Sequence, residues 1–189
     1  MSGALIVLLV FVGLLVVLAL IVIGIYNALV RLRNQVDNAW SQIDVQLKRR
    51  HDLIPNLVET ARGYMKHERE TFEAITHARS QAIGAKSVAE TAKAEGQRAD
   101  ALSKFMLVVE NYPELKANQN FLALQEELTG TENKIAFARQ YYNESVRALN
   151  TAIVTLPSML FVGMAGVSKH DFYEVPDASQ RNAPEVGFN

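Results

Sequence analysis

The chain has few residues whose types and spacing could support catalysis. Residues 67–71 read His-Glu-Arg-Glu-Thr, which begins like the H-E-x-x-H motif of zinc proteases but lacks its second histidine. Residues 84–87 read Gly-Ala-Lys-Ser and resemble a phosphate-binding loop, yet the glycine lies one place too early and no strand precedes it. Glu126 and Glu127 are neighbours, so a helix would point them in different directions rather than pair them. The sequence therefore predicts no catalytic residues.

Metal and redox chemistry also lack their usual residues. There is no cysteine, which excludes disulfides, zinc-thiolate sites and thiol nucleophiles. A di-iron bundle needs a glutamate three positions before a histidine on two helices, and none of the four histidines has one. With 19 basic and 20 acidic residues, the net charge of -1 gives no reason to expect nucleic acid as a partner. We expect no metal, no cofactor and no enzymatic activity.

One polar loop could contact a partner protein. Within residues 111–120 a proline stiffens the turn, and asparagines can cap the helix that follows. Loops on helical bundles are common binding sites, so the candidate partner contacts are Tyr112, Pro113, Glu114, Lys116 and Asn118. The alternative, which we favour, is a structural clamp between two helices.

The elements that position these residues begin with an apolar N-terminal segment. Residues 4–26 carry no charge and would span about 34 Å as a helix, enough to cross a hydrocarbon core of about 30 Å. A cleaved signal peptide is the alternative, but a basic N-terminal region and a small-x-small cleavage site are missing. We expect an uncleaved transmembrane helix, with Ala4 and Tyr26 as its limits.

The charges that flank this segment predict its orientation. Arg31 and Arg33 follow it directly, and no basic residue precedes it. The positive-inside rule then places the N-terminus outside and the rest of the chain in the cytoplasm. We expect three regions: residues 1–30 as the anchor, 31–157 as a cytoplasmic helical bundle, and 158–189 as an apolar segment with an irregular tail.

The region after the anchor favours helices throughout, because it lacks alternating strand patterns and contains few prolines. The first helix should run from the anchor to about Arg50, so the basic run at residues 48–50 would be a solvated helix end or a protein contact. Asp52 is a candidate N-cap for a second helix that has Pro55 in its first turn and ends near Gly84. A kinked helix continuous through Pro55 is the alternative. The expected apolar positions are Val36, Trp40, Ile43 and Leu47 on the first helix, then Val58, Ala61, Met65, Phe72 and Ile75 on the second.

Two further helices complete the expected fold. Ser87 and Glu90 have capping-box spacing and should open a third helix. Its expected inward positions are Ala92, Ala99, Leu102, Met106 and Val109. The fourth carries a heptad seam, which we expect to pack within one bundle, with an intermolecular coiled coil as the alternative. Its positions at intervals of seven are Phe121, Leu128, Ile135, Tyr142, Leu149 and Leu156. The predicted fold class is all-α, a single N-terminal transmembrane helix followed by an antiparallel, up-and-down four-helix bundle.

An apolar segment follows the fourth helix. Residues 148–168 carry no charge, but Pro157 interrupts them, so a second full span is not expected. If the helices alternate in direction, this segment returns toward the membrane. Met159, Leu160, Phe161 and Met164 are therefore candidate membrane-surface contacts. Packing of these side chains under the bundle is the alternative, and the one that we favour.

Four runs of sequence resemble the LemA family of membrane-anchored bacterial proteins. They are Ala-Trp-Ser-Gln-Ile-Asp-Val-Gln-Leu-Lys-Arg-Arg at residues 39–50, Asp-Leu-Ile-Pro-Asn-Leu-Val at 52–58, Tyr-Pro-Glu-Leu-Lys-Ala-Asn at 112–118 and Thr-Glu-Asn-Lys-Ile-Ala-Phe-Ala-Arg at 131–139. The resemblance implies an N-terminal anchor in the bacterial inner membrane, an N-outside topology and an antiparallel helical bundle, and it brings no catalytic residues. In the tail, Phe172-Tyr173-Glu174 is similar to an aromatic-acidic element of the family, whereas the glycines before it depart from the family pattern.

These features favour a positional function rather than a chemical one. The expected role is a membrane scaffold or adaptor, whose anchor raises the effective concentration of whatever the bundle binds. The expected partners are the lipid bilayer, further copies of the chain in a homo-oligomer, and an unidentified membrane or cytoplasmic protein. A regulatory subunit of a membrane protease or transporter is the alternative, and an enzyme with an unrecognised site is a remote one.

Overall fold

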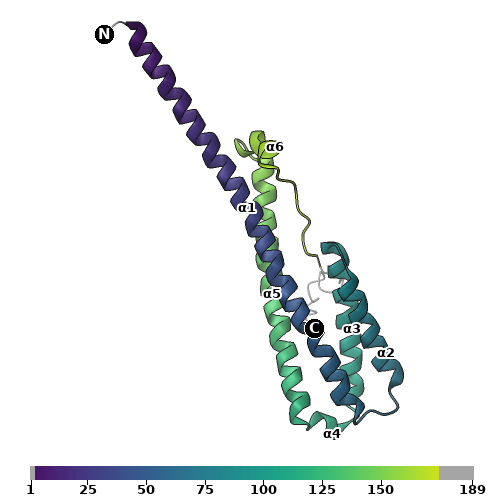
Figure 1. The fold of residues 1–189 in the computed structure, drawn as a ribbon. Coiled ribbons are helices and arrows are strands. Elements are labelled where there is room, and N and C mark those ends of the chain that lie inside the picture. Colours follow the sequence, from purple (N-terminus) through teal and green to yellow (C-terminus); the bar gives the residue numbers. More distant parts are fainter. Residues whose placement is uncertain (1–2, 175–189) are drawn as a thin grey trace, which may run out of the picture. The chain divides into compact units, whose positions relative to one another are not determined.

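The computed structural model describes residues 3–174, and in this part of the chain it contains six α-helices, one 3-10 helix and no strand (Figure 1). The predicted all-α class is confirmed. The elements are α1 (Gly3–Arg62), α2 (Arg69–Gly84), α3 (Val88–Val109), α4 (Pro113–Lys116), α5 (Gln119–Val154), the 3-10 helix η1 (Ser158–Phe161) and α6 (Val162–Ala165). The described residues divide into a first unit, 3–41 with 140–170, and a second unit, 42–139 with 171–174.

Helix α1 passes through Pro55 without a break. The predicted turn near residue 51 is therefore wrong, Asp52 is not an N-cap, and the continuous helix is correct. Proline has no amide hydrogen, so the carbonyl of His51, four residues earlier, loses its helical donor. Nε of Arg79, on α2, donates to this carbonyl at 2.6 Å. A neighbouring helix thus supplies the hydrogen bond that Pro55 removes.

Substituting Arg79 with alanine is expected to lower the free energy of unfolding by about 1–3 kcal/mol, because the carbonyl of the buried His51 would be left without a donor. Arg69→Ala is the matched control. Among residues 3–174 its guanidinium pairs with Glu73 on the same helix, and its side chain is 87% exposed, so its loss should have little effect. Urea denaturation of both variants in one detergent measures the difference. Equal losses would contradict the role given to Arg79.

The boundaries of α2 and α3 follow local sequence signals. α2 ends at Gly84, as predicted, but begins only at Arg69, so the predicted apolar row is divided between α1, the connection that contains Met65, and α2. The capping box of α3 is confirmed: the Ser87 hydroxyl accepts from the Glu90 amide at 3.2 Å, and the Glu90 carboxylate accepts from the Ser87 amide at 3.3 Å. One predicted inward position of α3 is wrong, since Ala99 is exposed.

The second unit has an apolar core to which five helices contribute. Its completely buried members are Leu57 and Ala61 of α1, Ile75 of α2, Phe105 of α3, Leu115 of α4 and Phe121 of α5. The rings of Phe72 and Phe105 lie 6.1 Å apart and join α2 to α3. This core holds the end of α1 among the helices that carry the candidate site.

In the first unit, α1 packs against the end of α5. The ring of Trp40 lies 5.4 Å from that of Tyr142, and Val36 and Leu149 are buried. The seam of α5 is buried by the chain itself from Phe121 to Leu149. Its last predicted position is wrong, because Leu156 lies beyond the end of α5 and is exposed.

α1 is the one helix in residues 3–174 that is long and apolar enough by itself to cross a membrane. The side chains of residues 3–21 are all exposed within the chain. The end of α5 and the η1–α6 segment pass the same test only jointly, and they are bent by 88°. The predicted single apolar N-terminal span is therefore present.

Candidate functional site

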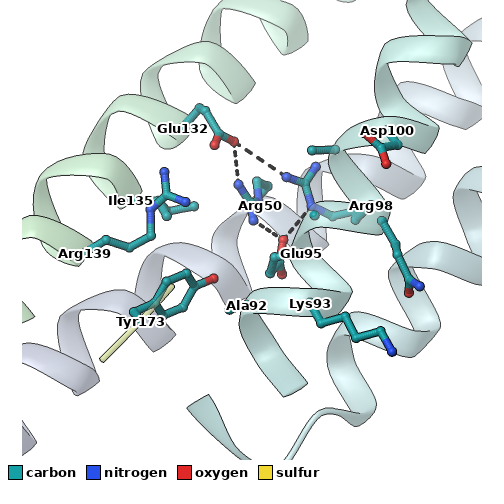
Figure 2. A pocket seen from close by; sticks show the side chains of 13 residues that line it. Arg50, Ala92, Lys93, Glu95, Arg98, Asp100, Glu132, Ile135, Arg139 and Tyr173 are labelled. Atoms are coloured by element: carbon teal, nitrogen blue, oxygen red, sulfur yellow. Dashed lines mark hydrogen bonds and ion pairs between the residues drawn. The ribbon is translucent and has the colours of Figure 1, made fainter. Parts of the chain in front are cut away.

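Charged side chains converge in the interior of the second unit (Figure 2). Arg50 comes from α1, and Glu95 and Arg98 come from successive turns of α3. All three are almost completely buried, at 2%, 5% and 1% exposure. Glu132 of α5 reaches the same place from a more exposed position, and His51 lies next to Arg50 on α1. We call these five residues the charge cluster.

Glu95 is the centre of the charge cluster. Its Oε2 accepts hydrogen bonds from Nη2 of Arg50 and, at 2.6 Å, from Nε of Arg98. Its Oε1 lies 2.6 Å from Nε2 of His51, which must be the donor because an ionised carboxylate only accepts. The second carboxylate, Glu132, accepts from Nη1 of Arg50 and lies 3.6 Å from Nη2 of Arg98. Each buried arginine therefore meets both carboxylates.

The electrostatics of the cluster keep its charges in place. Burial alone would raise the pKa of Glu95, but the hydrogen bond from His51 and the charges of Arg50 and Arg98 outweigh it and lower this pKa to about 2. Burial and the neighbouring charge of Arg50 lower the pKa of Arg98. Because arginine ordinarily titrates far above neutrality, Arg98 stays charged. The cluster thus pairs buried basic side chains with one buried carboxylate, Glu95, and one half-exposed carboxylate, Glu132.

A cavity of about 470 Å³ lies beside the charge cluster. Besides Arg50, Glu95, Arg98 and Glu132 of the cluster, its polar walls include Lys93, Asp100 and Arg139. Tyr173, from the segment after α6, is 4% exposed, and its ring lies 5.6 Å from the guanidinium carbon of Arg139 (Figure 2). This contact holds residues 171–174 against the cavity wall.

The arrangement is suited to holding helices together rather than to transferring protons. The carboxylate of Glu95 is occupied on both oxygens, and its low pKa makes it a poor acid or base near neutral pH. Within residues 3–174, Arg50 Nε and Arg98 Nη1 are buried without a hydrogen-bond partner. The described residues contain no group of three or more histidine or carboxylate side chains that could hold a metal ion. The ion pairs of the cluster join α1, α3 and α5.

Acid should weaken the fold through Glu95. Its folded pKa of about 2 lies below the ordinary value of 4.5, so its stabilisation is complete above about pH 4.5 and is lost as the pH falls from there toward 2. The expected slope is about 1.4 kcal/mol for each pH unit in this window. The measurement is the difference in the free energy of unfolding between wild type and Glu95→Gln at several pH values. Taking the difference removes the contributions of the other carboxylates, which both proteins share. A difference that does not shrink below pH 4.5 would contradict this assignment.

The polar loop predicted to contact a partner is partly a clamp. Tyr112 donates its hydroxyl to Oε1 of Glu68 at 3.0 Å, which raises the pKa of Tyr112. Asn118 donates to the hydroxyl of Tyr64 at 3.0 Å, and its Oδ1 accepts from the amide of Phe121 and so caps α5. The clamp that we favoured accounts for these two residues. Pro113, Glu114 and Lys116 are exposed and stay candidate partner contacts.

The predicted membrane residues all lie in the first unit. Ala4 and Tyr26 lie on one uninterrupted helix, followed on the same helix by Arg31 and Arg33. Met159, Leu160 and Met164 are exposed and Phe161 is half-buried, so packing of the first three under the bundle, the alternative we favoured, is wrong. Their contact with lipid stays a prediction.

Sequence reasoning missed the charge cluster. We expected residues 48–50 to be a solvated helix end or a protein contact, whereas α1 continues to Arg62, Arg50 is buried, and Arg49 pairs with Glu127 at 2.6 Å. Glu95 and Arg98 have the spacing of a helical ion pair, a signal that was present in the sequence. That spacing alone does not distinguish a buried pair from an exposed one.

The geometry is accompanied by a clear relationship to known proteins. The model of the LemA family matches residues 39–188, which include the charge cluster, the polar loop and Tyr173. The chain belongs to the LemA family. The predicted resemblance is therefore confirmed.

Curated relatives of this LemA family chain match it over only part of their own length. Protein LemA of Metamycoplasma hominis is 30% identical over 135 residues, which are 70% of this chain and 61% of that protein. Magnetosome protein MamQ of Magnetospirillum gryphiswaldense is 22% identical over 174 residues, 78% of this chain and 64% of that protein. Magnetosome protein MamQ 2 of Paramagnetospirillum magneticum is also 22% identical, over 175 residues, which are 79% of this chain and 64% of that protein. The chain spans somewhat over three fifths of the length of these relatives.

Proposed function

We propose that this LemA family chain is a non-enzymatic scaffold or adaptor anchored in the bacterial inner membrane. The observation that carries the proposal is the composition of α1: the same helix contains the apolar span and, further along, residues of the core of the second unit. A helix of this kind ties a helical protein-binding region to a bilayer. We further propose that the region is cytoplasmic and forms an antiparallel, up-and-down four-helix bundle, with the N-terminus outside.

The mechanism of such a protein is positional. An anchor confines the helical region to a thin layer at the membrane, which raises the effective concentration of its partners without any new contact. The proposed partners are further copies of the chain or another membrane or cytoplasmic protein. The exposed residues Pro113, Glu114 and Lys116 are the candidate contacts, because they lie on the short helix α4, whose flanking residues Tyr112 and Asn118 are fixed by hydrogen bonds.

A crosslinking experiment tests partner recruitment directly. A photo-reactive residue in place of Glu114 or Lys116 should give specific crosslinked products in intact cells, whereas the same residue at Lys104, an exposed position on α3, should not. Mass spectrometry then identifies the product as a second copy or another protein. If the protein is a monomer in detergent and gives no specific product at position 114 or 116, the scaffold proposal is contradicted. One membrane protease or transporter captured at a fixed ratio would favour a regulatory subunit instead.

The proposed orientation has its own test, because the chain is free of cysteine. Single cysteines replace Ser2 and Ser103, and an impermeant maleimide is added to intact cells. Labelling is expected at position 2 alone. Labelling at position 103 in intact cells would show that the topology is the reverse of the proposed one.

A further inference from the structure

A group of exposed apolar side chains follows α5 in the first unit. Leu156, Met159, Leu160 and Met164 are 66%, 48%, 70% and 58% exposed, although they are among the most apolar residues of the segment. We call these four residues the apolar foot. Exposed apolar side chains gathered in one short segment indicate contact with another molecule or with a membrane.

The foot is held in a defined place rather than on a loose chain. Ala165 and Val167 are buried, so one side of the segment packs against the protein while the other faces out. Gly166, with a φ of 60°, makes the turn between them, in a conformation that other residues rarely adopt. The side-chain amide of Asn150 on α5 donates to the carbonyl of His170 at 2.9 Å and accepts from its backbone N–H at 3.0 Å.

The unit that carries the foot reaches the end of the apolar span. Residues 3–21 of α1 are exposed, Val22 and Ile25 are half-buried, and Leu29 is 1% exposed. Residues 140–170, which include the foot, are the other part of this compact unit. Figure 1 shows α6 beyond the end of α5. Leu29 lies only about 4.5 Å along the helix from Tyr26, the limit of the span.

The charges around the foot suit the surface of a bilayer. Residues 148–168 carry none, while Arg147 and Lys169 lie just outside this stretch and are exposed. Arg31 and Arg33 follow the span on α1. Apolar side chains bordered by basic ones are typical of segments that lie in the boundary between headgroups and acyl chains, where anionic lipids attract the cations.

We propose that the apolar foot inserts into the leaflet of the bilayer at the Tyr26 end of the span, which gives the chain a second membrane contact. This inference rests on the proposed membrane crossing of α1. Lipid is the occupant that the structure favours, because the foot belongs to the unit that also contains the exposed apolar residues of the proposed span in α1.

Spin labels test this proposal on the full chain in nanodiscs of phosphatidylethanolamine and phosphatidylglycerol. Single cysteines are introduced at Leu160 and Met164 of the foot, at Leu15 inside the span, and at Leu107, an exposed apolar residue of α3. Power-saturation spectroscopy compares collisions with oxygen, which concentrates in lipid, against collisions with a water-soluble nickel chelate. Labels at 15, 160 and 164 should collide more with oxygen, and the label at 107 more with nickel.

The controls separate failure of the foot from failure of the anchor. If the label at position 15 reports lipid but those at 160 and 164 behave like the label at 107, insertion of the foot is contradicted, whereas the membrane crossing of α1 is supported. If position 15 also behaves like 107, the membrane crossing itself is wrong. If labels at 160 and 164 are shielded from both reagents and show broadening between copies, a second chain covers the foot and lipid insertion is overturned.

Discussion

Replacing Glu95 with glutamine is expected to lower the free energy of unfolding by about 3–5 kcal/mol at neutral pH. Glu95 is 5% exposed and accepts hydrogen bonds from Arg50, Arg98 and His51. Glutamine keeps the shape of the side chain but removes the negative charge. Two buried guanidinium groups would then share only the half-exposed carboxylate of Glu132. The loss comes mainly from leaving buried positive charge without compensation.

The matched control is Glu127→Gln, which also breaks an arginine–glutamate pair between α1 and a second helix. Its side chain is 40% exposed and that of its partner Arg49 is 51% exposed, so the expected cost is about 0–1 kcal/mol. Urea denaturation in one detergent, monitored by circular dichroism, compares the two variants. If Glu95→Gln costs no more than Glu127→Gln, the charge cluster does not stabilise the fold.

A combined variant distinguishes charge compensation from simple packing. Arg50→Met and Arg98→Met, added to Glu95→Gln, remove the buried positive charges that the single substitution leaves unpaired. Apolar replacement of a whole buried ion cluster is often neutral or stabilising. The triple variant should therefore be more stable than Glu95→Gln alone. A further loss of stability would show that the arginine side chains contribute through packing.

The sequence was most informative where local rules act alone. The apolar span, the capping box at Ser87 and the glycine end of α2 follow from composition and from hydrogen bonds within one turn. The seam of α5 was also predicted, because regularly spaced apolar residues must be buried together. Leu156 lies outside it because α5 ends at Val154.

The remaining differences depend on partners that are distant in sequence. Pro55 predicts a break because its effect on the carbonyl of His51 is local, whereas the compensating donor, Arg79, belongs to another helix. The same holds for the charge cluster. Patterning assigns charged residues to the solvent face, so it selected Ala99 of α3 and passed over Glu95 and Arg98. Their burial depends on Arg50, which lies on a different helix and 45 residues from Glu95.

Substituting Tyr173 with alanine is expected to cost about 3 kcal/mol, the lower end of the range for removing a large buried aromatic side chain. The ring is 4% exposed and lies against Arg139 at the cavity beside the charge cluster. Burial, and secondarily the charge of Glu95, raise the pKa of the Tyr173 hydroxyl to about 12 against the opposing charges of nearby arginines. The ring is therefore neutral near pH 7, and it attracts Arg139 through its π-face rather than as an anion.

Phe172→Ala is the control for Tyr173→Ala, because it removes the adjacent aromatic side chain from the same segment. Phe172 is 38% exposed, so its loss should cost far less than that of Tyr173. Hydrogen exchange adds a local measurement to the unfolding curves. Tyr173→Ala should speed the exchange of α3 amides around Glu95, since the ring covers that side of the cavity. Similar stability losses for the two variants, with unchanged exchange at Glu95, would show that Tyr173 does not hold the segment against the cluster.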